Sequence, residues 1–377
     1  MSTFKSSSSD IIQAGFIPLI DCAPLVIAKE KGFAKQEGIN LKLNREVSWA
    51  NIRDRLNVGQ FDVAHMLAGM PIAANLGIGQ IKTHQIAPIA LGRGGNAVTV
   101  SKPLYSALNE TGRNIQDALA AGQALRKILE DRRDKGQDPL TFAMVFPFSN
   151  HNYQLCHWLA ASGIDPANDL RLIVIPPPFM VQSLEAGQID GFCVGEPWNS
   201  LAAKQKVGEV LFPTAKVWPR GPEKVLGMQR DWAETNSAPL SALLRALDLA
   251  ATWSDDGKNR LELSRILARK DYLGVDSNQI LAALQTGMKF SRGNGVEARQ
   301  EDALWLYAQM VRWGQISPST EAWSITCETY RPDLLSTALG EHPKNTGGIN
   351  RNLITPPLSD IPFDPQDVEG YVLACQR

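Results

Sequence analysis

The feature that most constrains the fold is an alternation of short apolar strands with amphipathic helices, which begins at residue 11. Residues 11–16 are a short apolar run, residues 22–38 carry apolar side chains at helical spacing, and residues 39–47 alternate apolar and polar side chains. Gly38 is placed to end the helix, because glycine readily takes the left-handed conformation found at helix C-termini. Strand, helix and strand in this order predict a β-α-β unit and therefore a parallel sheet.

A second constraint is a short sequence pattern that occurs twice in the chain, which we call the internal echo. The segments RLNVGQFDVAHML (55–67) and SLEAGQIDGFCVG (183–195) share the pattern L-x-x-G-Q-[F/I]-D. Each segment has the pattern of a helix end, a glycine–glutamine turn and an apolar strand. The strand–helix order around them also repeats, which favours two lobes of similar plan, although a chance match within one α/β protein would give the same letters.

Together these patterns predict an α/β protein with two lobes around a ligand cleft. Segments near 92–101 and 212–224 carry the chain from one lobe to the other and back. The predicted division is a disordered lead-in at 1–9, a first lobe over 10–95, a second lobe over 96–215, and a return over 216–377 that completes the first lobe with a mainly helical region and a proline-rich tail. Clefts of this kind commonly hold small ligands, and unpaired N–H groups at helix starts favour anions there.

The composition argues against several classes of function. The chain has 38 basic and 39 acidic residues, so no bulk field attracts nucleic acid or an anionic membrane. No stretch approaches the roughly 20 apolar residues of a membrane span. With five cysteines and no C-x-x-C pair, neither a disulfide framework nor a zinc site is expected. The N-terminal residues lack the apolar core of a secretory signal, so we expect a cytoplasmic protein unless a leader has been removed.

No catalytic signature is present in the sequence. It contains no G-x-x-x-x-G-K-[S/T], no G-x-S-x-G, no H-E-x-x-H and no G-x-G-x-x-G after a strand. We therefore expect binding rather than catalysis, with no cofactor and no metal. Glu196, in FCVGEPW, has no evident nucleophile or second acid beside it, so a structural carboxylate is favoured over a general base.

The uncharged candidates for ligand contact lie at predicted cleft positions. Trp49 follows a strand, and Ser48 is placed to cap the next helix, which leaves the Ala50 N–H near its open end. Asn96 lies in the first crossing, and His151 begins a helix after an apolar strand. Each has a plain structural alternative, which is a packed aromatic ring, a turn residue or a solvated helix start.

A single cation accompanies these donors. Lys224, in RGPEKVLGM, lies on the second crossing and can reach a cleft from there, although a lone lysine is usually surface charge. One ammonium with several uncharged N–H donors would suit a small monovalent oxyanion. The prolines at 176–178 can form a rigid wall. His157, Cys156 and Cys193 are expected to be packing residues.

With these residues assembled, the chain resembles the nitrate-binding NrtA family, the solute-binding proteins of nitrate and bicarbonate ABC importers, over about residues 10–373. The resemblance is carried by GFIPLIDCAPLVIAKEKGFAKQEG, SWANIRDRL, FDVAHMLAGMP, FPFSNHNYQLCHWLAASG, VIPPPFMV, FCVGEPW and PEKVLGMQRDW. It implies a type II periplasmic-binding-protein fold with one oxyanion held between the lobes.

The resemblance also implies a ligand-contacting set. Carried over position by position, this set falls on Trp49, the Ala50 N–H, Asn96, His151, Pro177 and Lys224. Ala50 stands where the importers have glycine, which keeps the backbone donor. Asn96 stands where they have glutamine, which shortens the reach by one methylene. The bicarbonate-binding relatives have an acidic residue at the position of Lys224, so a lysine there favours nitrate or nitrite, which bring no proton.

Because no export signal is visible, the chain is more similar to the cytoplasmic branch of the family, the NasS-type nitrate/nitrite sensors. That resemblance implies a NasT-type RNA-binding antiterminator as partner, released when the anion closes the lobes, with no direct nucleic-acid or membrane binding by this chain. The alternative is the substrate-binding protein of an ABC nitrate importer, with its leader absent or removed. An enzyme on the same fold, like the related pyrimidine-precursor synthases, would need reactive histidines or cysteines in the cleft.

Overall fold

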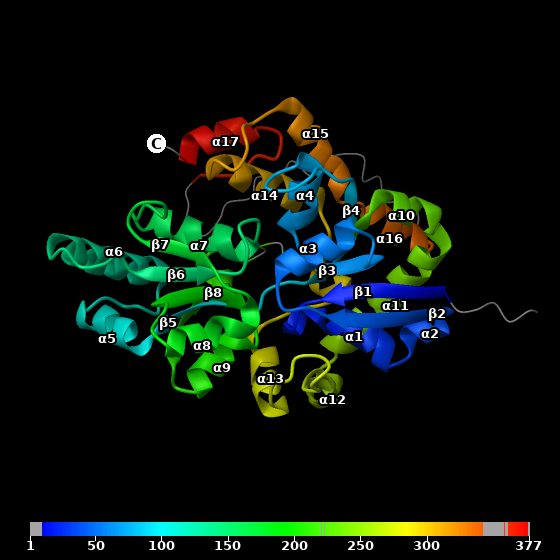
Figure 1. Cartoon of the computed structure of the whole chain (residues 1–377), viewed down its shortest axis with the longest axis horizontal. Coiled ribbons are helices and arrows are strands. Elements are labelled where there is room, and N and C mark those ends of the chain that lie inside the picture. Colours follow the sequence, from blue (N-terminus) through cyan, green and yellow to red (C-terminus); the bar gives the residue numbers. More distant parts are fainter. Residues whose placement is uncertain (1–9, 220, 222, 342–357, 359–360, 376–377) are drawn as a thin grey trace, which may run out of the picture.

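The computed structural model describes residues 10–219, 221, 223–341, 358 and 361–375. The lead-in predicted at 1–9 and much of the proline-rich tail therefore lie outside the described residues. Two five-stranded sheets organise the described chain, and Figure 1 shows them side by side, with the first to the right and the second to the left. We call each sheet with its packed helices the first unit and the second unit.

The first sheet has the strand order β2-β1-β3-β10-β4. Strands β1 and β2 are parallel, as the β-α-β pattern predicts, and β1 is also parallel to β3, whereas β10 is antiparallel to both β3 and β4. The strands are β1 (Asp10–Phe16), β2 (Ile39–Arg45), β3 (Val63–Leu67), β4 (Gln85–Gly92) and β10 (Lys224–Gln229).

The second sheet repeats this plan with the order β7-β6-β8-β5-β9. Strand β6 is parallel to β7 and β8, and β5 is antiparallel to β8 and β9. In each sheet the strand that arrives from the other unit, β10 or β5, is the antiparallel one. The strands are β5 (Asn96–Ser101), β6 (Thr141–Met144), β7 (Arg171–Val174), β8 (Gly191–Gly195) and β9 (Gly208–Pro213).

The internal echo marks equivalent strands, β3 and β8, so the prediction of two units of similar plan is confirmed. The aspartate of each repeated segment makes the same two hydrogen bonds to the neighbouring parallel strand. Asp62 accepts from the Gln13 N–H at 2.7 Å and donates its own N–H to the Gln13 carbonyl at 2.9 Å. Asp190 does the same to Thr141, at 2.8 and 2.7 Å.

The chain crosses between the sheets from β4 to β5 and returns from β9 to β10, near the two predicted crossings. The residue boundaries that the sequence gives to the lobes stay predictions. Helices of the first unit are α1 (Ala23–Glu30), α2 (Phe33–Gln36), α3 (Trp49–Asn57) and α4 (Gly69–Leu76); those of the second are α5 (Lys102–Glu110), α6 (Ala118–Asp134), α7 (Asn150–Ala161), α8 (Met180–Glu185) and α9 (Trp198–Lys204).

The C-terminal part is mainly helical, as predicted, and it joins the units. Helix α11 packs against α1 and α2 of the first unit, whereas α14 contacts both α4 of the first unit and α7 of the second. The helices are α10 (Arg230–Thr235), α11 (Ser237–Asp255), α12 (Arg260–Leu267), α13 (Ser277–Ala283), α14 (Gln300–Arg312), α15 (Thr320–Thr329), α16 (Pro332–Ala338) and α17 (Val368–Cys375). Within the described residues, no helix has both the length and the apolarity needed to cross a bilayer.

Candidate functional site

Polar side chains gather where strand ends of the two sheets meet. Lys224 is the first residue of β10, and its register places it beside Leu67, at the end of β3, and Gly92, at the end of β4. Asn96 is the first residue of β5 and lies opposite Gly195, the last residue of β8. Both candidate side chains are thus carried by the strands that enter from a crossing.

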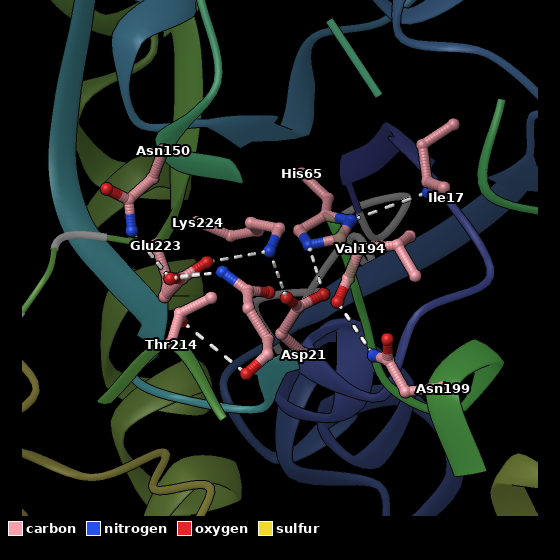
Figure 2. A network of polar contacts seen from close by, with 10 residues as sticks. Ile17, Asp21, His65, Asn150, Val194, Asn199, Thr214, Glu223 and Lys224 are labelled. Atoms are coloured by element: carbon pink, nitrogen blue, oxygen red, sulfur yellow. Dashed lines mark hydrogen bonds and ion pairs between the residues drawn. The ribbon is translucent and has the colours of Figure 1, made fainter. Parts of the chain in front are cut away.

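The Lys224 ammonium is fully buried and paired with two carboxylates. Its Nζ lies 2.7 Å from Asp21 Oδ2 and 2.9 Å from Glu223 Oε2. Burial alone would lower the pKa of Lys224, but the charges and hydrogen bonds of Asp21 and Glu223 raise it above its usual value. Burial likewise acts to raise the pKa of Asp21, yet the charge of Lys224 holds it well below its usual range. Lys224 and Asp21 therefore form a charged pair, drawn in Figure 2.

His65, on β3, completes the arrangement around Asp21. Its Nε2 lies 3.0 Å from Asp21 Oδ1, and its Nδ1 accepts from the Ile17 N–H at 3.4 Å. A neutral imidazole with its proton on Nε2 satisfies both contacts. Burial lowers the pKa of His65 more than Asp21 raises it, which agrees with the neutral form. The Trp49 ring lies against this histidine with 5.4 Å between ring centroids.

Glu223 connects this charged pair to the second unit. Its Oε1 accepts from Asn96 Nδ2 at 2.5 Å and from Asn150 Nδ2 at 2.7 Å, while Oε2 faces Lys224. Asn96 begins β5 and Asn150 begins α7, whose N-terminus is capped by the Ser149 side chain. Burial raises the pKa of Glu223, against the charge of Lys224 and the three hydrogen bonds.

His151 lies beside this network with its ring nitrogens unused. It is the second residue of α7, and its side chain is completely buried. Neither ring nitrogen has a hydrogen-bond partner among the described residues. A Cβ placed on Gly195 would lie 3.7 Å from His151 Nε2 and 3.2 Å from Asn96 Oδ1, so both side chains border the end of β8. Burial, and next the charge of Lys224, lowers the pKa of His151 well below its usual value. His151 is therefore a neutral donor and acceptor at this junction.

Of the other residues named from the sequence, Trp49 is brought to the network and Pro177 is not. Trp49 opens α3 behind its cap Ser48, and its indole Nε1 has no partner among the described residues. Ala50 follows in the first turn, where backbone N–H groups have no intrahelical acceptor. Pro177 is a buried residue at the start of a 3₁₀ turn (Pro177–Phe179), and the contacts that join the other residues do not include it.

The expectation of a single ammonium among uncharged donors is wrong. Lys224 has two carboxylate partners, and Asn96 gives its amide N–H to one of them. The physical reason is desolvation, because an ammonium buried in a protein interior costs several kcal/mol unless it is paired and hydrogen-bonded.

Asp21, His65, Asn150 and Glu223 are residues of the site that reasoning from the sequence missed. Asp21 had a usable signal, because it interrupts the apolar run FIPLIDCAPLVIA, and an acid buried in such a run needs a cation. Asn150 lies next to His151 and Glu223 next to Lys224, but adjacency gave no direction for their side chains.

The other polar residues near the junction are structural. Glu196 is buried, its carboxylate accepts from the Ser200 N–H at 3.1 Å, and its carbonyl accepts from the Ile20 N–H of the first unit at 2.9 Å. His157 lies 3.0 Å from Arg312 Nη1, and Cys156 and Cys193 are buried thiols. No group of three or more metal-ligating side chains in the described part of the chain could hold a metal ion.

The chain is similar in sequence to known proteins along most of its length. The family model described as NMT1-like matches residues 7–268. The nitrate import ATP-binding protein NrtC of Synechocystis is 37% identical over 96% of this chain, and the nitrate/nitrite binding protein NrtA of Synechococcus elongatus is 32% identical over 96% of this chain and 85% of its own length. The chain spans about half of the first curated relatives that it matches, 54% in the case of NrtC.

The fold is shared with a solved structure along nearly its whole length. The crystal structure of the periplasmic nitrate-binding protein NrtA from Synechocystis superposes with a TM-score of 0.86, at 28% identity, covering 98% of this chain and 99% of that one. The expected periplasmic-binding-protein fold is therefore confirmed. The chain belongs to the NMT1-like family and is a homologue of the nitrate/nitrite-binding protein NrtA.

Proposed function

We propose that this protein is a receptor for nitrate or nitrite, held where the two units meet. The observation that carries the proposal is His151, a neutral imidazole that has no hydrogen-bond partner among the described residues and is buried beside Lys224 and the end of β8. A buried polar group left unpaired costs about 1–3 kcal/mol, so a ligand that bonds to this ring gains that free energy. The relatives NrtA and NrtC, whose names state nitrate, support the choice of anion.

The proposed contacts come from both units. His151 supplies a ring N–H, Trp49 its indole N–H, the start of α3 the Ala50 N–H, and Lys224 positive charge. Asn96 borders the site at the end of β8, and it also positions Glu223 through the hydrogen bond from its amide group. Pro177 is proposed as wall rather than as donor, since proline has no N–H.

The test is calorimetric titration of the purified protein with nitrate, nitrite and bicarbonate. His151→Ala removes the proposed ring donor, and we expect nitrate to bind at least about tenfold more weakly, which corresponds to about 1.4 kcal/mol. His157→Ala is the matched control, since His157 is also buried on α7 but contacts Arg312 instead. It should leave the affinity within about twofold.

Thermal unfolding of both variants establishes that they are folded before their affinities are compared. A wild-type protein that binds none of the three anions would overturn the proposed function. An affinity that His151→Ala leaves unchanged would remove this histidine from the site.

For the wider role, we favour a solute-binding component of an ABC importer, because the similar protein NrtC is named a nitrate import ATP-binding protein and NrtA a nitrate/nitrite binding protein. The cytoplasmic sensor that controls a NasT-type antiterminator stays a prediction from family resemblance. If anion binding stabilises one arrangement of the units, a partner that prefers the other arrangement loses affinity by the same factor. Co-purification with such an antiterminator, disrupted by nitrate but not by chloride, would support the sensor. A complex that nitrate leaves intact would count against it.

A further inference from the structure

Glu223 has a role in anion binding that its charge makes unexpected. Its carboxylate is itself a planar oxyanion, and it accepts three hydrogen bonds, two from asparagine amides and one from the Lys224 ammonium. Two of these donors, on Asn96 and Lys224, are groups that a bound nitrate would be expected to use. The side chain is buried between the two units, so its charge is not screened by solvent.

The charges at the junction leave it negative. Lys224 carries one positive charge, while Asp21 and Glu223 carry one negative charge each when ionised, which makes a net charge of −1. His65 and His151 add nothing, because burial keeps both imidazoles neutral. A monovalent anion arriving here would be a second uncompensated negative charge in a buried site, which is unfavourable at low effective dielectric.

We propose that Glu223 takes up one proton when the anion binds, so that the receptor binds its ligand together with a proton and Glu223 sets the pH dependence of the affinity. The inference rests on the proposed function. A protonated Glu223 keeps Oε1 as acceptor for Asn96 and Asn150, and it releases Lys224 to face both Asp21 and the ligand.

Glu223 is better placed for this proton than Asp21. Burial already raises the pKa of Glu223, whereas the pKa of Asp21 is held low by Lys224 and by its contact with His65. Within the part of the chain that the structure describes, the groups that face Glu223 come from several elements. They are Lys224 on β10, Asn96 on β5, Asn150 on α7, Asp21 beyond Lys224, Cys193 on β8, and Arg93 of the first crossing, which is paired with Asp302.

The experiment is titration with nitrate, which stays ionised throughout, between about pH 6 and pH 8 in pairs of buffers with different ionisation enthalpies. The dependence of the binding heat on the buffer gives the number of protons taken up. For the wild type we expect net proton uptake and an affinity that falls as the pH rises, by up to about tenfold per pH unit where Glu223 titrates. Glu223→Gln mimics the protonated acid, so it should abolish both effects and hold the affinity near its low-pH value.

Glu196→Gln is the matched control, because Glu196 is a second buried glutamate at the junction and has a pKa raised to about 7 by burial. This variant should retain proton uptake. Nitrate binding by the wild type without proton uptake would overturn the inference while leaving the proposed function standing. Uptake that persists in Glu223→Gln, or that disappears in Glu196→Gln, would also overturn it. No binding at any pH would instead contradict the proposed function.

Discussion

The first unit brings an ion pair to the junction, whereas the second unit brings uncharged hydrogen-bond donors. Asp21, His65 and Lys224 all belong to the first unit, whereas Asn96, Asn150 and His151 belong to the second. The sheets have the same topology, so backbone plan does not explain the difference. The ion pair of the first unit lies within one body, and its charges stay compensated however the units are arranged.

The second unit also has a buried carboxylate near the junction, and its pKa is shifted in the opposite direction from that of Asp21. Glu196 has no cation partner among the described residues, and burial raises its pKa to about 7. Asp21, equally buried but beside Lys224, has a pKa held well below its usual range. The contrast teaches that a buried acid stays ionised here only where a cation is built next to it.

The largest expected effect is the loss of that cation. Lys224→Met leaves Asp21 and Glu223 uncompensated in a buried site, so we expect the free energy of unfolding to fall by about 3–5 kcal/mol, with loss of nitrate binding. Chemical denaturation and calorimetry measure the two effects. Lys204→Met is the control, since Lys204 pairs with Asp276 at 3.8 Å on the exposed surface, and it should cost less than about 1 kcal/mol. Equal losses in both variants would contradict the comparison.

A pH series tests the unpaired acid of the second unit. The pKa of Glu196 is raised in the folded protein, so its contribution to stability is present below its unfolded pKa, about 4.5, and is lost as the pH rises through about 7. Glu196→Gln should therefore gain stability relative to the wild type by about 3 kcal/mol between pH 4.5 and pH 8. Unfolding free energies of both proteins at each pH provide the measurement, and a difference that does not change with pH would show that the carboxyl is not desolvated.

The contact between the units can be broken without touching a charge. A Cβ on Gly69, at the start of α4, would lie 2.4 Å from the backbone carbonyl oxygen of Phe148 in the second unit. Gly69→Ala should cost about 1–3 kcal/mol of stability and weaken nitrate binding, because the two units can no longer approach as closely. Gly257→Ala is the control, since a Cβ there meets no atom within 4 Å. Small-angle X-ray scattering with and without nitrate measures whether the protein becomes more compact on binding. A Gly69→Ala variant that still becomes more compact would contradict the role of Gly69 in the approach of the two units.

The smallest expected effect comes from one neutral donor of the first unit. Trp49→Phe keeps an aromatic ring against His65 and removes the indole N–H, which has no partner among the described residues. We expect nitrate affinity to fall by a factor of about two to ten, the equivalent of about 0.5–1.5 kcal/mol for one hydrogen bond, with little change in melting temperature. Unchanged affinity in calorimetry would place the indole outside the ligand site.

Much of the fold was predictable because it is written in local periodicity. The β-α-β pattern of residues 11–47 gave the parallel pairing of β1 with β2, and the repeated L-x-x-G-Q-[F/I]-D gave the equivalence of β3 and β8. The same patterns placed Lys224 and Asn96 near the crossings. Lys224 and Asn96 are the first residues of β10 and β5. A strand that follows a crossing starts at the end of its sheet where the two units meet.

The sequence could not determine which interaction partners each side chain of the site has. In the sequence Lys224 has only Glu223 as a charged neighbour, because its other partner, Asp21, is distant in the chain and nothing local ties the two together. The hydrogen bonds from Asn96 and Asn150 to Glu223 could not be predicted either. The three residues lie on separate segments of the chain, and these come together only in the folded protein. Local spacing therefore determined the strands, the crossings and the position of His151, while the charge state of the site was settled only by tertiary contacts, because electrostatic free energies depend on distance and burial rather than on order along the chain.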